Sequence, residues 1–166
     1  MFKINSFKNK LFPLKSIYIF EDFLSDSECN SIIELLNSNS FNKARQFSLG
    51  RNNKEMFIND KYFHNLITKK FKASLYSFLK FKKFSKPFEF YKYDDGDFIK
   101  PHTDSPRLFS DNTESNYTAI IYLNDNFDGG ATYFNDLDKN ITPKKGLLLL
   151  FDHSLKHEAK TVNNGI

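Results

Sequence analysis

The pattern of the chain changes after Lys86-Pro87, and this change constrains the fold more than any other feature. From here on, short runs of aromatic and β-branched residues alternate with turns that contain Gly, Pro, Asn or Asp. The pattern predicts extended segments at 88–93, 117–123, 131–134 and 147–151. Strands at this spacing are typical of a sandwich or barrel.

The first half carries two helix signals. Ser25-Asp26-Ser27-Glu28 forms a capping box, in which serine and glutamate side chains satisfy the first backbone N–H groups of a helix. An apolar face follows, so we predict a helix over about 26–37. A second helix is predicted between Asp60 and Leu79, where large apolar residues recur at spacings of three and four. A short strand is expected within 17–24, and loop or irregular strand over 37–53.

These elements predict an α+β fold, a jelly roll with N-terminal supporting helices. The length of 166 residues and a hydrophobic content of 40% fit one domain better than two. We expect residues 1–86 to form the helical support region and residues 87–166 the jelly-roll core. The longest purely apolar run, 147–151, is much too short to span a bilayer, so no membrane partner is expected.

The net charge of +4 hides an asymmetry between the two halves. Residues 1–86 hold 16 Lys and Arg against 7 Asp and Glu, while residues 87–166 hold 8 against 13. An acidic site surrounded by a basic surface would produce this split. The single cysteine, Cys29, allows no internal disulfide, and the N-terminus carries no signal-like apolar stretch. A cytosolic location is therefore the expectation.

The histidines carry the chemical information. His102 and Asp104 lie two residues apart, so on an extended segment their side chains point to the same face. His157 follows the apolar run 147–151, and in a rolled sheet such a strand can lie beside the one that carries His102. Two imidazoles and one carboxylate form the metal site of non-haem Fe(II) oxygenases. By spacing alone, this motif is a weak signal.

The sequence around these residues strengthens the prediction of an iron site. Five segments resemble, in order, the prolyl 4-hydroxylase type of 2-oxoglutarate- and Fe(II)-dependent dioxygenase: 93–104, 117–124, 129–134, 142–151 and 157–165. The resemblance implies a double-stranded β-helix, which agrees with the jelly roll predicted above. It also implies that His102, Asp104 and His157 bind Fe(II) and that Tyr93 hydrogen-bonds the cosubstrate 2-oxoglutarate. Ascorbate is a further cofactor that the resemblance admits.

Strand alternation adds two candidates without reference to the family. If Thr118 faces inward, Ile120 and Tyr122 face inward as well. Thr118 and Tyr122 are therefore predicted to contact the cosubstrate. The alternative is that Tyr122 belongs to the core, with its hydroxyl satisfied there.

The sequence departs from the family at its end. The family anchors the remote carboxylate of 2-oxoglutarate with a Lys or Arg about ten residues after the second metal histidine, which here would be position 167. The sequence ends at Ile166, so we expect that this cation and the last strand lie beyond it. Otherwise another chain supplies the cation, or 2-oxoglutarate binds poorly and the chain is inactive. Within the chain, Arg107 and Lys100 are the first candidates.

Two further groups of residues could suggest metal sites, but we interpret them as loop and turn residues. His153 lies four residues before His157 but outside any predicted helix, so we interpret it as a loop histidine. Asp94, Asp95 and Asp97 lack the ladder of a calcium loop and are interpreted as turn residues.

The leading hypothesis is an enzyme that couples decarboxylation of 2-oxoglutarate to hydroxylation of a prolyl or other residue of a peptide or protein. Segments 41–53 and 105–115 are the natural lids. One alternative is a nucleic-acid-directed oxygenase or demethylase, motivated by lysines interleaved with phenylalanines over 69–86, although a solvated helix face is the favoured interpretation of that segment. The other is a jelly-roll module that binds metal without turnover.

Overall fold

The computed structural model describes residues 4–8, 16–44, 50–79 and 83–164 of the chain. It has an α+β fold, and both predicted helices are confirmed. Helix α1 spans Asp26–Asn37 and helix α2 spans Lys61–Leu79. The capping box of α1 is formed on both sides, because the backbone N–H of Ser25 donates to Glu28 and the backbone N–H of Glu28 donates to the Ser25 hydroxyl.

The described strands form antiparallel sheets. Two of these sheets have four strands, with the orders β1-β2-β11-β7 and β10-β9-β12-β6, a third has the order β3-β4-β5, and β8 pairs with β13. The strands are β1 Ile4–Lys8, β2 Ser16–Phe20, β3 Asn42–Lys43, β4 Lys54–Ile58, β5 Phe88–Lys92, β6 Ile99–His102, β7 Tyr117–Ile121, β8 Asp128–Gly129, β9 Thr132–Phe134, β10 Lys139–Ile141, β11 Leu148–Asp152, β12 His157–Ala159 and β13 Val162–Asn163.

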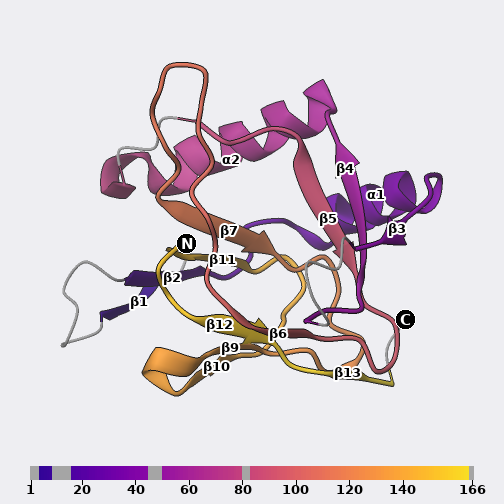
Figure 1. Cartoon of the computed structure of the whole chain (residues 1–166). Helices are drawn as coiled ribbons and strands as arrows, with labels where there is room; N and C mark the ends of the chain where they lie inside the picture. The colour runs from indigo at the N-terminus through magenta and orange to yellow at the C-terminus, as the bar shows by residue number, and fades with distance from the viewer. Residues whose placement is uncertain (1–3, 9–15, 45–49, 80–82, 165–166) are drawn as a thin grey trace.

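The sheet that contains β2 and β11 lies in the middle of the molecule. In Figure 1 the two helices lie above it and the sheet of β9, β10, β12 and β6 lies below. Alternate residues of the central strands therefore enter two different cores: Phe20 and Leu148 pack with the helices, whereas Ile19 and Phe151 pack with the lower sheet. Burial on both faces explains why the run 147–151 is continuously apolar.

The structure adds strands that the sequence pattern did not predict. Strand β6 contains Pro101 but lies at the edge of its sheet, where a proline without an N–H removes no ladder hydrogen bond. Strand β4 begins with Lys54 and Glu55 and pairs along its whole length with β5. The polar residues of β4 and the proline of β6 are not typical of strands, so the sequence pattern did not predict them. Pairing with neighbouring strands determines that these segments are extended.

The two halves of the chain share their sheets. Strand β2 from the first half pairs with β11 from the second, and β4 pairs with β5 across the predicted boundary at residue 86. The region 1–86 thus contributes strands as well as helices. The division into a support region and a core stays a prediction.

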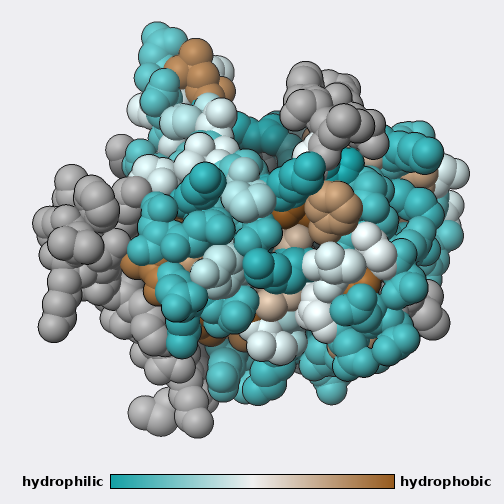
Figure 2. All heavy atoms as spheres, turned by 60° about the horizontal axis from the view of Figure 1, so that its bottom comes forward, coloured by the Kyte–Doolittle hydropathy of each residue, from teal (hydrophilic) through white to brown (hydrophobic). Residues whose placement is uncertain are grey.

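None of the described helices is long and apolar enough to cross a bilayer. The face shown in Figure 2 is mostly hydrophilic, with apolar residues in small, separate patches. Cys29 is fully buried.

Candidate metal centre

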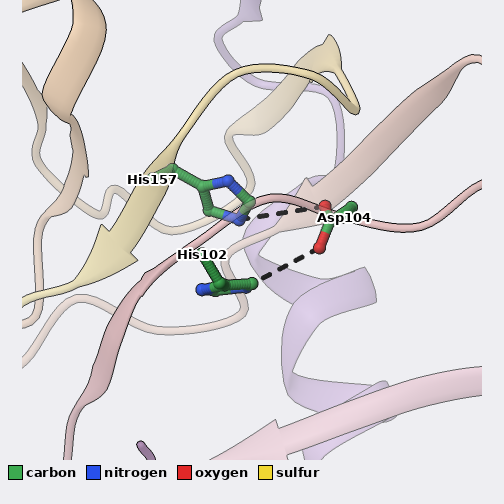
Figure 3. A group of neighbouring side chains, drawn as sticks. All are labelled: His102, Asp104 and His157. Carbon is green, nitrogen blue, oxygen red and sulfur yellow. Dashed lines mark ion pairs between the residues drawn. The ribbon is translucent and has the colours of Figure 1, made fainter.

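Three side chains that can ligate a metal meet between β6 and β12. His102 is the last residue of β6, Asp104 follows two residues later, and His157 is the first residue of β12. His102 and His157 are direct cross-strand partners, which places their ring centroids 4.4 Å apart. Figure 3 shows the three side chains turned toward one another. One ligating atom from each lies within 4.8 Å of the others.

Local hydrogen bonds fix the tautomer of both imidazoles. Nδ1 of His102 lies 2.9 Å from the carbonyl oxygen of Lys100, and Nδ1 of His157 lies 3.0 Å from that of Leu155. A carbonyl can only accept, so each Nδ1 carries the hydrogen. Each Nε2 therefore keeps a lone pair that can bind a metal. Nε2 of His102 lies 3.6 Å from Oδ1 of Asp104, and Nε2 of His157 lies 3.8 Å from Oδ2.

Burial sets the charge of His157. The residue is 5% exposed, and its ring packs against the rings of Phe134 and Phe151. Desolvation lowers the pKa of His157, although its bond to Leu155 and the charge of Asp104 oppose the shift. The neutral imidazole that a metal requires is thus favoured near neutral pH.

The segment that carries the three ligands resembles a known protein family. Residues 88–166, which contain all three ligands, match the family model of the 2OG-Fe(II) oxygenase superfamily. This half of the chain therefore belongs to the 2OG-Fe(II) oxygenase superfamily. No curated protein sequence matches the oxygenase.

Two solved structures share its fold. The viral collagen prolyl hydroxylase of Paramecium bursaria Chlorella virus 1, solved with 2-oxoglutarate, is 22% identical, with a TM-score of 0.67 and 90% of each chain covered. A prolyl-4-hydroxylase of Pseudomonas putida is 18% identical, with a TM-score of 0.65 and 89% of this chain and 85% of that chain covered. At this identity the likeness establishes the fold.

The residues present fit Fe(II). Two neutral imidazoles and one carboxylate are the donor set of the facial triad, which leaves further positions of the ion for other ligands. The oxygenase is a 2-oxoglutarate- and Fe(II)-dependent dioxygenase with an intact triad of His102, Asp104 and His157. The bound ion lets 2-oxoglutarate and O2 react with a C–H bond to give succinate, CO2 and the hydroxylated product.

The three residues predicted as cosubstrate contacts differ in their surroundings. Burial raises the pKa of Tyr93 and of Tyr122, so both phenols stay protonated and can donate to a carboxylate. The Tyr122 hydroxyl also lies 2.7 Å from that of Thr132. The third residue, Thr118, donates its hydroxyl hydrogen to Oδ2 of Asp104. As predicted, Ile120 of β7 and Tyr122, the residue after its end, lie on the same side and pack on the lower core.

One residue near the site was missed in the sequence analysis. The guanidinium of Arg51 lies 4.8 Å from the ring centroid of Tyr91, and its positive charge counteracts the rise in the pKa of Tyr93. Its Nε donates to Asn53, while Nη2 is buried without a hydrogen bond and lies 3.7 Å from Glu55. No motif in the sequence pointed to it, since Arg51 lies 51 positions before His102. Only the fold brings the Arg51 backbone beside Ile99 of β6, with which it forms an isolated bridge.

The structure describes both cations named from the sequence as possible anchors of 2-oxoglutarate. Arg107 pairs with Glu89 of β5, and Lys100 is exposed. His153 is a loop histidine, as predicted, and does not belong to the metal cluster of the described residues. The acidic run after Tyr93 is a turn, closed by a hydrogen bond from the backbone of Asp97 to that of Asp94.

Proposed function

We propose that this oxygenase hydroxylates a prolyl or other residue of a peptide or protein. The observation that carries the proposal is an intact triad in a fold shared over about nine-tenths of the chain with two prolyl hydroxylases. Peptide chains offer both apolar rings and backbone polar groups, so a matching surface needs aromatic and charged residues together.

The sheet beside the triad offers such a surface. Phe57 and Tyr91 are 44% and 42% exposed, and the β4–β5 register puts them on one face. Burial raises the pKa of Tyr91, and the negative charges of Glu55 and, more weakly, Asp104 raise it further. Its hydroxyl donates to Glu89, which pairs with Arg107, three residues after the metal carboxylate. We infer that a peptide lies across this face.

The described part of the basic segment 69–86 gives little support to the alternative of a nucleic-acid substrate. Phe71 is 2% exposed and Phe84 packs against the same core, so neither ring is placed to stack on bases. Lys70 pairs with Glu28 and Lys83 with Asp111, so an acidic partner balances the charge of each of these two lysines. Phe81, Lys80 and Lys82 lie outside the described residues.

Two further parts of the proposal rest on the sequence and the family. They are the double-stranded β-helix and the cosubstrate contacts of Tyr93 and Tyr122. The raised pKa of Tyr93 and of Tyr122, which keeps both partly buried phenols protonated, supports the last of these. A cytosolic location and a role for ascorbate also stay predictions.

The test is product analysis with candidate substrates. The enzyme is incubated with Fe(II), 2-oxoglutarate and proline-containing peptides, and mass spectrometry looks for one added oxygen that comes from labelled O2. We expect hydroxylated peptide and an equal amount of succinate, and neither with Asp104→Ala. Oxidation of methylated single-stranded DNA or RNA without peptide turnover would overturn the proposal in favour of the alternative.

A further inference from the structure

We propose that Thr118 is a positioning residue for the metal carboxylate. Its hydroxyl donates to Oδ2 of Asp104, which as an ionised carboxylate can only accept. The bond holds the carboxylate against rotation and leaves Oδ1, on the side of His102, for the metal. The inference rests on the triad and not on the identity of the substrate.

Asp104 is the ligand that needs this support most. Both histidines lie in β strands that pair with each other, whereas Asp104 lies two residues beyond the end of β6. Its backbone N–H donates to the carbonyl of His153 at 3.2 Å, which fixes the main chain but not the side chain. The Thr118 hydroxyl supplies the missing restraint on the carboxylate.

The position of Thr118 is itself determined by the central sheet. Thr118 on β7 is the direct partner of Phe151 on β11, so both side chains point to the same face. The Phe151 ring packs edge-on against His157, with centroids 4.6 Å apart. One cross-strand pair thus supports two of the three ligands, Asp104 through a hydrogen bond and His157 through packing.

The experiment measures Co(II) binding to the metal-free full chain, since Co(II) occupies sites of this type and has a visible spectrum that reports ligand geometry. Thr118→Val is nearly isosteric and removes the hydroxyl, while Thr118→Ser keeps it. We expect Thr118→Val to lose about 10- to 100-fold in Co(II) affinity and to change the spectrum, as for other neighbours of metal ligands. Thr118→Ser should retain both, as should Thr142→Val, a matched change at an exposed site.

Two further comparisons separate positioning from a general effect on folding. In an Asp104→Ala background, adding Thr118→Val should leave the residual Co(II) affinity unchanged, because the carboxylate it acts on is gone. If Thr118→Val does not fold, Thr118→Ala and Thr118→Ser, which differ only in the hydroxyl, replace it in the comparison.

The proposal is overturned if removal of the hydroxyl leaves Co(II) affinity and spectrum as in the wild type. It is also overturned if Thr118→Ser loses as much affinity as Thr118→Ala, because the methyl group would then account for the effect. These measurements contain no substrate, so failure to find peptide turnover leaves them unaffected.

Discussion

At the residue scale, local hydrogen bonds orient the two metal-binding histidines. The Nδ1 hydrogens of His102 and His157 are bound by carbonyls two residues earlier in the chain. The same short segments that carry the ligands therefore also orient them. Asp104 differs, because its restraint comes from Thr118 on another strand.

Replacing Asp104 by Ala should abolish turnover of 2-oxoglutarate. Two neutral imidazoles remain, with no anion to balance the charge of Fe(II). We expect Fe(II) affinity to fall by at least about 100-fold, since even the loss of a ligand's neighbour costs roughly 10- to 100-fold. Anaerobic titration with Fe(II) measures this, with Glu114→Ala as the control for an exposed carboxylate. Equal affinity in the two variants would contradict the triad.

Lowering the pH should destabilise the metal-free protein through His157. Burial lowers the pKa of His157 below its ordinary value of 6.5, so the unfolded chain binds a proton there before the folded protein does. The stability due to this group is complete above pH 6.5 and is lost as the pH falls from that value toward the folded pKa. Urea denaturation at pH 7.5 and 5.5 measures the loss. The loss of free energy of unfolding between these pH values should be smaller in His157→Asn than in the wild type. An identical loss in the two proteins would show that His157 is not its cause.

At the element scale, tight turns hold the strands that carry the site. Gly146 precedes the apolar run and has φ of +78°, a conformation that costs side-chain-bearing residues energy. Its N–H donates to the carbonyl of Tyr122, and its carbonyl accepts from Leu24. A β-carbon at this position would collide with the backbone oxygen of Leu24. The turn thus joins β11, β7 and the approach to α1.

Gly146→Ala should therefore destabilise the fold more than a positive φ alone explains. Gly96 provides the matched control, because its φ is +83° and nothing lies within 4 Å of an added β-carbon. We expect Gly96→Ala to cost about 1 to 2 kcal/mol and Gly146→Ala at least about 3 kcal/mol in free energy of unfolding. Chemical denaturation compares the two variants. Similar losses would show that the backbone of Leu24 moves aside.

At the scale of the whole molecule, the central sheet separates two cores. Two phenylalanines of the lower core make ring contacts with His157. One of them, Phe134, is fully buried in the lower core. Phe71, in contrast, is buried in the upper core, where its ring contacts Phe23 and Phe84. The upper core mainly joins the helices to the sheet. The lower core also supports a metal ligand.

Matched changes in the two cores should separate stability from metal binding. Phe71→Leu and Phe134→Leu should each lower the free energy of unfolding by about 1 to 2 kcal/mol, through lost burial and imperfect packing. Only Phe134→Leu should also weaken Co(II) binding to the folded protein, because it removes a ring that packs on His157. Equal effects on Co(II) affinity would mean that the site responds to global stability alone.

The sequence by itself determined the features that depend on short-range chemistry. The capping box set the start of α1, the apolar spacing identified both helices, and the run 147–151 identified β11. His102 and Asp104 could be paired because a strand brings alternate residues to one face. His157 could be added through the resemblance to a family, which supplied the long-range contact that spacing does not contain.

The tertiary structure alone decided what depends on pairing between distant segments. Strands β4 and β6 form because β5 and β12 accept their backbone groups, although their own sequences are polar or contain proline. Likewise, only the fold brings the Thr118 hydroxyl to Asp104 and Arg51 beside Tyr91. Local preferences are encoded within a few residues, whereas such contacts arise from the register of whole sheets, which no single segment specifies.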